Sequence, residues 1–144
     1  MKSENCLICE RIKLIEKGEN PYFVKKVNSG YIVLGDSQYF NGYTLLLNKK
    51  HTDSLLNLNI IEKFWFFWNL MKTYKAVNSA FKPNKINVEL LGNTDHHLHW
   101  HIFPRYKTDK FPSKPVWVID EKIRNKKSDM KLVTRNITKI NSKL

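Results

Sequence analysis

The chain has 144 residues and a formal charge of +12, because 25 lysines and arginines stand against 13 acidic residues. This length suits one domain with a single core, and a hydrophobic fraction of 42% excludes an intrinsically disordered chain. The most apolar run, Phe64–Trp68, is too short to span a bilayer, and no apolar leader follows Met1. We therefore expect one domain over residues 1–144, in the cytoplasm and without a membrane partner.

The positive charge gathers at the end of the chain. Residues 122–144 hold eight lysines and arginines and one aspartate, so eight minus one, or +7 of the total +12, lies there. A basic C-terminal extension, from about residue 107, is therefore expected. The basic tail could bind nucleic acid, but a solvated helix face accounts better for its charge, and we expect truncation before Ser128 to leave the chemistry intact.

The predicted elements, in chain order, are typical of an α+β domain. Strands are expected at residues 22–27, 31–34, 44–48, 85–91 and 97–103. A short amphipathic helix is expected over residues 7–17, a long helix from the N-cap Asn59 to Phe81, and a terminal helix over residues 128–141. This order favours a mostly antiparallel sheet of about five strands with helices packed against it.

The long helix carries a broad apolar stripe. Its members are Ile61, Phe64, Trp65, Trp68 and Met71. Aromatic stripes at helical spacing usually mark a buried face. We expect this stripe to belong to the core, with a dimer contact as a further role, rather than to bind a cofactor.

Histidine recurs at every second position in the run His97-Leu98-His99-Trp100-His101-Ile102-Phe103. Side chains alternate between the faces of a strand, so the three histidines are expected on one face and the apolar residues on the other. Each imidazole has two nitrogens that need partners when buried, so three on one face indicate a site more than packing. His96 has the wrong phase and is expected to be structural or exposed.

Cys6 and Cys9 have the C-x-x-C spacing that a tetrahedral zinc site can use. With only two cysteines in the chain, a disulfide scaffold is disfavoured. Zinc would need two further ligands. A redox pair and incidental thiols remain as alternatives.

The histidine repeat resembles the histidine triad, His-φ-His-φ-His-φ-φ with φ apolar, which defines the HIT family of nucleotidyl hydrolases and transferases. The likeness extends to Asn87-Val88-Glu89-Leu90-Leu91-Gly92-Asn93, to Pro104-Arg105, and to Gly42-Tyr43-Thr44-Leu45-Leu46-Leu47 with Lys49-Lys50-His51. It covers about residues 6–105 and is closest to the small bacterial HIT hydrolases. The resemblance implies a HIT-like fold and a homodimer with two active sites, formed by pairing of the sheets.

The resemblance assigns His99 as the nucleophile that attacks the α-phosphorus of a nucleotide and holds the nucleotidyl group covalently. It places His101, Asn93, Thr94 and Asn87 around the phosphates and the leaving group. Asp36 could accept hydrogen bonds from ribose hydroxyls. Ordinary turn chemistry is an equal alternative for the loop residues Asn93 and Thr94, and it also fits Asp36.

The resemblance also supplies the missing zinc ligands. Several HIT proteins bind zinc through two cysteines and two histidines, and the matching positions here are Cys6, Cys9, His51 and His97. Such a zinc would be structural and would fix the ring of His97. Many HIT proteins carry a histidine where Tyr43 stands, so the group that orients the imidazoles is left open.

Three functions remain open from the sequence. The first is hydrolysis of phosphoanhydride or phosphoramidate bonds, as in dinucleoside polyphosphates or adenosine phosphoramidates. The second is a nucleotidyltransferase or phosphorylase, and the third is a zinc-stabilised nucleic-acid-binding module with a vestigial triad. The complete triad favours an enzyme, but no residue indicates the acceptor or the base.

Overall fold

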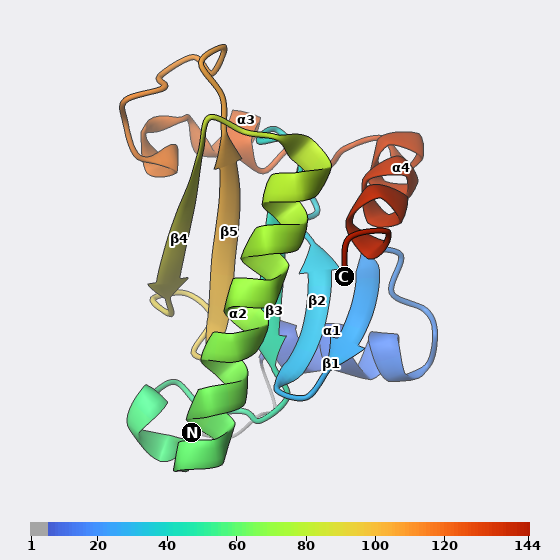
Figure 1. Cartoon of the computed structure of the whole chain (residues 1–144), viewed down its shortest axis with the longest axis vertical. Coiled ribbons are helices and arrows are strands. Elements are labelled where there is room, and N and C mark those ends of the chain that lie inside the picture. Colours follow the sequence, from blue (N-terminus) through green and yellow to red (C-terminus); the bar gives the residue numbers. More distant parts are fainter. Residues whose placement is uncertain (1–5) are drawn as a thin grey trace.

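The computed structural model describes residues 6–144 and is built on a five-stranded antiparallel sheet (Figure 1). The strands are β1 (Phe23–Val27), β2 (Gly30–Leu34), β3 (Thr44–Asn48), β4 (Lys85–Leu91) and β5 (His99–Arg105), in the spatial order β1-β2-β3-β5-β4. The helices are α1 (Leu7–Glu16), α2 (Ile60–Phe81), α3 (Glu121–Arg124) and α4 (Met130–Asn141), with 3-10 turns η2 (Leu55–Asn57) and η3 (Val116–Val118). The predicted α+β class is confirmed. The prediction that no apolar leader follows Met1 concerns residues that lie outside the described range.

Helices cover both faces of the sheet (Figure 1). The face that carries Leu46 and Ile102 packs against α2 and α4 and forms the larger core. The opposite face, with Tyr31 and Val33, is covered by isoleucines of α1. Among residues 6–144, no helix has both the length and the apolar character needed to cross a membrane.

The long helix α2 begins where the sequence predicts but buries a different face. Asn59 and Glu62 form a capping box: each side chain accepts the backbone N–H of the other residue, at 2.9 and 2.8 Å. The buried side chains are Phe66, Asn69, Leu70, Thr73, Ala76 and Val77. The predicted core stripe is therefore wrong, because most of its members point away from the sheet and Trp65 is only half-buried. The helix is apolar on nearly every side, so periodicity could not identify the inner face.

The C-terminal helix α4 belongs to the core as well as to the surface. Its basic residues are exposed, as the sequence predicts, but Val133 and Ile140 are fully buried against the larger core. The Asn136 amide donates to the side chains of Gln38 and Asn41, at 3.0 and 2.9 Å. Removing the basic extension would therefore open the core, so it is not only a solvated face.

Candidate functional site

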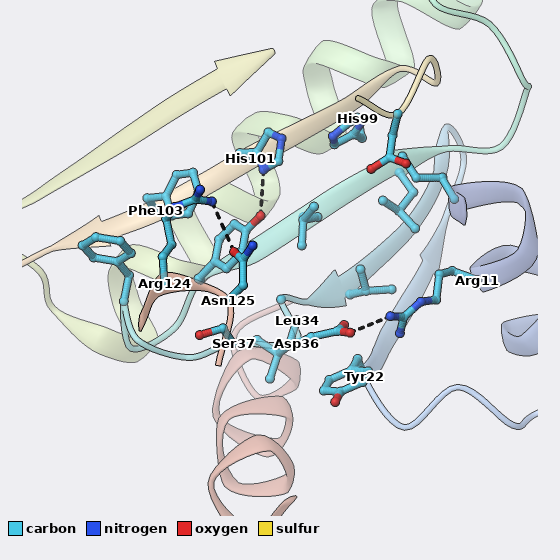
Figure 2. Close-up of a pocket in the computed structure, with 18 of the residues that line it drawn as sticks. Arg11, Tyr22, Leu34, Asp36, Ser37, His99, His101, Phe103, Arg124 and Asn125 are labelled. Carbon is cyan, nitrogen blue, oxygen red and sulfur yellow. Dashed lines mark hydrogen bonds and ion pairs between the residues drawn. The ribbon is translucent and has the colours of Figure 1, made fainter. Parts of the chain in front are cut away.

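A cavity of about 380 Å³ lies over the sheet between α1 and the C-terminal segment (Figure 2). The sheet contributes His99 and His101 from β5, and Tyr43 lies directly before β3. Arg11 and Asp36 line one part of the cavity, and residues after β5 line another. The lining residues from that later segment are Trp117, Arg124, Asn125 and Lys127. Polar groups thus surround two adjacent imidazoles, whose ring centroids are 4.6 Å apart.

The three histidines do not share one strand, so the predicted strand over residues 97–103 is wrong at its start. The chain bends at His97, whose N–H donates to the Asp95 carbonyl at 2.7 Å, and β5 begins at His99. His99 and His101 line the cavity, whereas His97 points to Cys6 and Cys9. The triad is therefore divided between two sites. His96 is exposed, as its phase predicts.

The backbone of His97 fixes the tautomer of His99. The Nδ1 atom of His99 lies 2.6 Å from the His97 carbonyl oxygen. A carbonyl oxygen can only accept, so Nδ1 carries the proton and donates it. In the neutral ring the lone pair is then on Nε2, the atom that a nucleophilic histidine would use.

Tyr43 orients the second imidazole and so fills the role left open by the sequence. Its hydroxyl lies 2.7 Å from His101 Nδ1, and burial raises the pKa of Tyr43, which keeps the hydroxyl protonated. Burial, with contributions from His99 and Arg124, lowers the pKa of His101 to about 3, so this ring is neutral near pH 7. Tyr43 can therefore donate to Nδ1, leaving the ring proton of His101 on Nε2. Gly35 permits this position, because a Cβ there would collide with the Tyr43 ring.

Four atoms that can ligate a metal ion converge around Nδ1 of His97. The Sγ atoms of Cys6 and Cys9 and the Nδ1 atoms of His51 and His97 all lie within 4.8 Å of one another. The Nε2 of His97 donates to the Asn48 carbonyl at 2.7 Å, which leaves the lone pair on Nδ1, facing the two cysteines. Burial raises the pKa of Cys9 to about 11, so a thiolate there needs a neighbouring cation.

The distances fit a tetrahedral metal ion. With bonds of about 2.3 Å to sulfur and about 2.0 Å to nitrogen, neighbouring sulfur and nitrogen ligands lie about 3.5 Å apart. The nitrogen–sulfur distances are 3.4 Å from His51 to Cys9 and 3.5 Å from His97 to each cysteine. Cys6 is the N-cap of α1, and its sulfur accepts the N–H of Cys9 at 3.4 Å, so the start of the helix holds both thiols. These residues could hold a metal ion.

The remaining predicted site residues are distributed unevenly. Asp36 lines the cavity and pairs with Arg11 at 2.5 Å. Asn93 and Thr94 are exposed on the loop between β4 and β5 and do not line the cavity, although the adjacent Asp95 does. Asn87 lies outside the lining too; it pairs with Phe103 across the strands, and its side chain accepts from Arg105 at 3.4 Å. Their predicted contacts with phosphate stay predictions.

The family model described as HIT domain matches residues 21–108, more than half of the chain. The chain belongs to the HIT-domain family. An uncharacterized HIT-like protein of Borreliella burgdorferi is 28% identical over 123 residues, which cover 76% of this chain and 82% of that protein. The protein hit of Bacillus subtilis is 29% identical over 123 residues, 80% of each chain. A crystal structure of a histidine triad protein from Sinorhizobium meliloti 1021 shares the fold, with a TM-score of 0.77 at 17% identity over 90% of this chain and 94% of that chain.

This HIT protein therefore falls within a superfamily of nucleotide-binding hydrolases and transferases. Part of its cavity lies beyond the matched residues. Trp117 and Arg124 follow the end of the match at residue 108, yet both line the cavity. The one sequence signal for Arg124 is the excess of basic residues, which is equally typical of a solvated helix, and no sequence signal pointed to Trp117.

Proposed function

We propose that this HIT protein hydrolyses nucleotides at the α-phosphorus through a covalent nucleotidyl-His99 intermediate. The observation that carries the proposal is the hydrogen bond from His99 Nδ1 to the His97 carbonyl, because it leaves the Nε2 lone pair of a cavity-lining histidine free. Imidazole is nucleophilic while neutral, and its bond to phosphorus can be broken again. The same hydrogen bond makes His97 a positioning residue through its backbone.

The reaction divides into two displacements. In the first, the His99 Nε2 lone pair forms a bond to the α-phosphorus, while the bond to the leaving group breaks and its electron pair departs with that group. In the second, water attacks the phosphorus, loses a proton, and releases the mononucleotide as His99 regains its lone pair. The Nε2–H of His101, oriented by Tyr43, lies beside His99 and would donate to a phosphate oxygen or to the leaving group. A sugar phosphate or inorganic phosphate in place of water would make the same protein a transferase.

A panel of substrates tests this function. Purified protein is expected to release AMP from a dinucleoside polyphosphate, from adenosine 5'-phosphoramidate, or from both. Products are separated by chromatography with and without added inorganic phosphate. With adenosine 5'-phosphoramidate, AMP as the sole new nucleotide indicates a hydrolase, whereas ADP formed only with phosphate indicates a phosphorylase. Hydrolysis of diadenosine triphosphate releases AMP and ADP together, whereas phosphorolysis converts both halves to ADP. Absence of turnover on the whole panel would contradict an enzymatic function.

We also propose that the Cys6, Cys9, His51 and His97 site holds structural zinc. Two thiols and two imidazoles form a closed donor set typical of such sites, and their spacing supports a tetrahedral ion. The ion would link the start of α1 to His97, just before β5. It would thereby hold in place the His97 carbonyl, which orients His99. Thiol ligands persist best in a reducing compartment, which supports the cytoplasm as the location.

A homodimer is the assembly that the exposed surface supports. Phe64, Trp68 and Met71 of α2 are 56%, 50% and 59% exposed, next to a sheet in which β4 is an edge strand. An apolar helix face beside a free strand edge is suited to an isologous contact with a second copy. This surface is the stripe whose predicted role included a dimer contact.

Sedimentation tests the homodimer. At about 10 μM the protein is expected to sediment as two chains, and Trp68→Glu is expected to give one chain, since a buried carboxylate in the contact would be unpaired. Phe111→Glu is the matched control, because it places the same charge at another exposed aromatic position. A monomeric wild-type protein, or a Trp68→Glu protein that stays dimeric, would contradict this interface.

A further inference from the structure

The segment after β5 is folded so that Trp117 lines the cavity beside His101. Val116 and Ile119 are buried with Phe40 and Phe103, which anchors η3. The Trp117 ring stands edge-on to His101 with centroids 5.9 Å apart, and its indole N–H donates to Glu89 at 2.6 Å. Trp117 is therefore held from two sides and lies next to the His101 imidazole.

Arg124 lies on this tryptophan and brings a positive charge to the cavity. Its guanidinium carbon is 4.5 Å from the Trp117 ring centroid, a cation–π distance. Within residues 6–144 no carboxylate lies within 4.0 Å of it, and its buried Nε atom has no partner. Its hydrogen bond goes to the neutral amide of Asn125, at 3.3 Å. The other arginine of the cavity, Arg11, is neutralised by Asp36.

The two arginines lie in different parts of the cavity. Figure 2 shows Arg11 and Asp36 beside Tyr22, while Arg124 and Asn125 lie near Phe103 and His101. The Arg124 charge contributes to the lowered pKa of His101, so the guanidinium is within electrostatic reach of that ring. A nucleotide whose α-phosphorus lies at His99 would thus have a cation on the His101 side. An unpaired, partly buried guanidinium is complementary to phosphate oxygens.

We propose that Arg124, supported by Trp117, binds the leaving group, and that this leaving group is a phosphate or phosphoanhydride chain. The proposal rests on the function proposed above and specifies its substrate class: nucleotides with two or more phosphates, in preference to phosphoramidates. When Nε2 of His99 forms its bond to the α-phosphorus, the bridging P–O bond breaks and its electron pair stays on the leaving oxygen. Arg124 then neutralises an oxyanion that needs no proton. The ammonia or amine released from a phosphoramidate carries no negative charge and would gain little from Arg124.

The kinetic test compares two substrates with different leaving groups. Arg124→Gln is expected to lower kcat/KM for diadenosine triphosphate about 10- to 100-fold, since it removes charged hydrogen bonds to the leaving group. With adenosine 5'-phosphoramidate the change is expected to be about threefold or less, which also shows that the variant is folded. Arg124→Lys should retain part of the preference for diadenosine triphosphate over adenosine 5'-phosphoramidate, because it keeps the positive charge. Lys126→Gln removes an adjacent exposed charge and should change neither substrate. Equal losses on both substrates, or no loss, would overturn the proposal.

A binding test separates this proposal from the catalytic one. In a His99→Ala background, calorimetry is expected to show ADP bound about tenfold or more tightly than AMP, and Arg124→Gln is expected to remove that difference. If the protein turns over neither substrate but this difference depends on Arg124, the catalytic function fails and the phosphate site stands. If ADP and AMP bind equally, or if their difference survives Arg124→Gln, the phosphate site is wrong whatever the turnover.

Discussion

Replacement of His99 by alanine is expected to lower nucleotide turnover about 10³-fold or more, because it removes the atom that forms the bond to phosphorus. The side chain is buried in the wall of the cavity and its Nδ1 is held by the His97 carbonyl. The other histidine that lines the cavity, His101, has its Nδ1 lone pair engaged by the Tyr43 hydroxyl and so lacks a free one. The measurement is kcat/KM on the best substrate of the panel, with folding checked by circular dichroism.

Two other histidines give the controls for this result. His96→Ala is expected to change kcat/KM by about threefold or less, because His96 is exposed and outside the cavity. His101→Ala is expected to slow the reaction while leaving the nucleophile in place. If His99→Ala retains turnover within about tenfold of wild type, His99 is not the nucleophile.

Loss of the metal is expected to have the largest effect on stability. Protein purified without chelator should contain about one zinc per chain, and His51→Ala or Cys9→Ser should contain almost none. The midpoint of thermal unfolding should fall by about 6–16 °C, because about 3–4 kcal/mol of metal binding is lost and each kcal/mol is worth about 2–4 °C at this size. Turnover should fall with it, since His97 would no longer hold the backbone that orients His99.

The matched control is again His96→Ala, which removes an imidazole that is not a ligand. It should keep both its zinc and its unfolding midpoint. Wild-type protein that contains no zinc, or that unfolds at the same temperature after complete removal of its zinc, would contradict the structural role of the ion.

Local patterns predicted much of this fold because they depend on the chain alone. The capping box at Asn59 and Glu62, and the ranges of β3 and β4, follow from short-range sequence signals. The convergence of Cys6, Cys9, His51 and His97 was implied by the resemblance, since their closeness depends on contacts distant in sequence.

Other features depend on tertiary contacts that no local pattern contains. The alternating triad predicts one continuous strand, but the chain bends at His97, where that ring meets the cysteines of α1. The apolar character of α2 on nearly all sides concealed which face meets the sheet. Tyr43 gains its place from a contact with His101, which is distant in the sequence, and Arg124 reaches the cavity only because the segment after β5 folds back beside His101.

The central claim, a covalent nucleotidyl bond on His99, is tested most directly by intact mass spectrometry. The protein is mixed with its substrate and quenched within one turnover, and its intact mass is measured. A second portion is digested to locate the modified peptide. We expect a mass increase of one adenylyl group, labile to acid and confined to the peptide that contains His99. No adduct should form on His99→Ala, and His96→Ala should form it normally. An adduct on another residue, or efficient turnover by His99→Ala, would contradict the account.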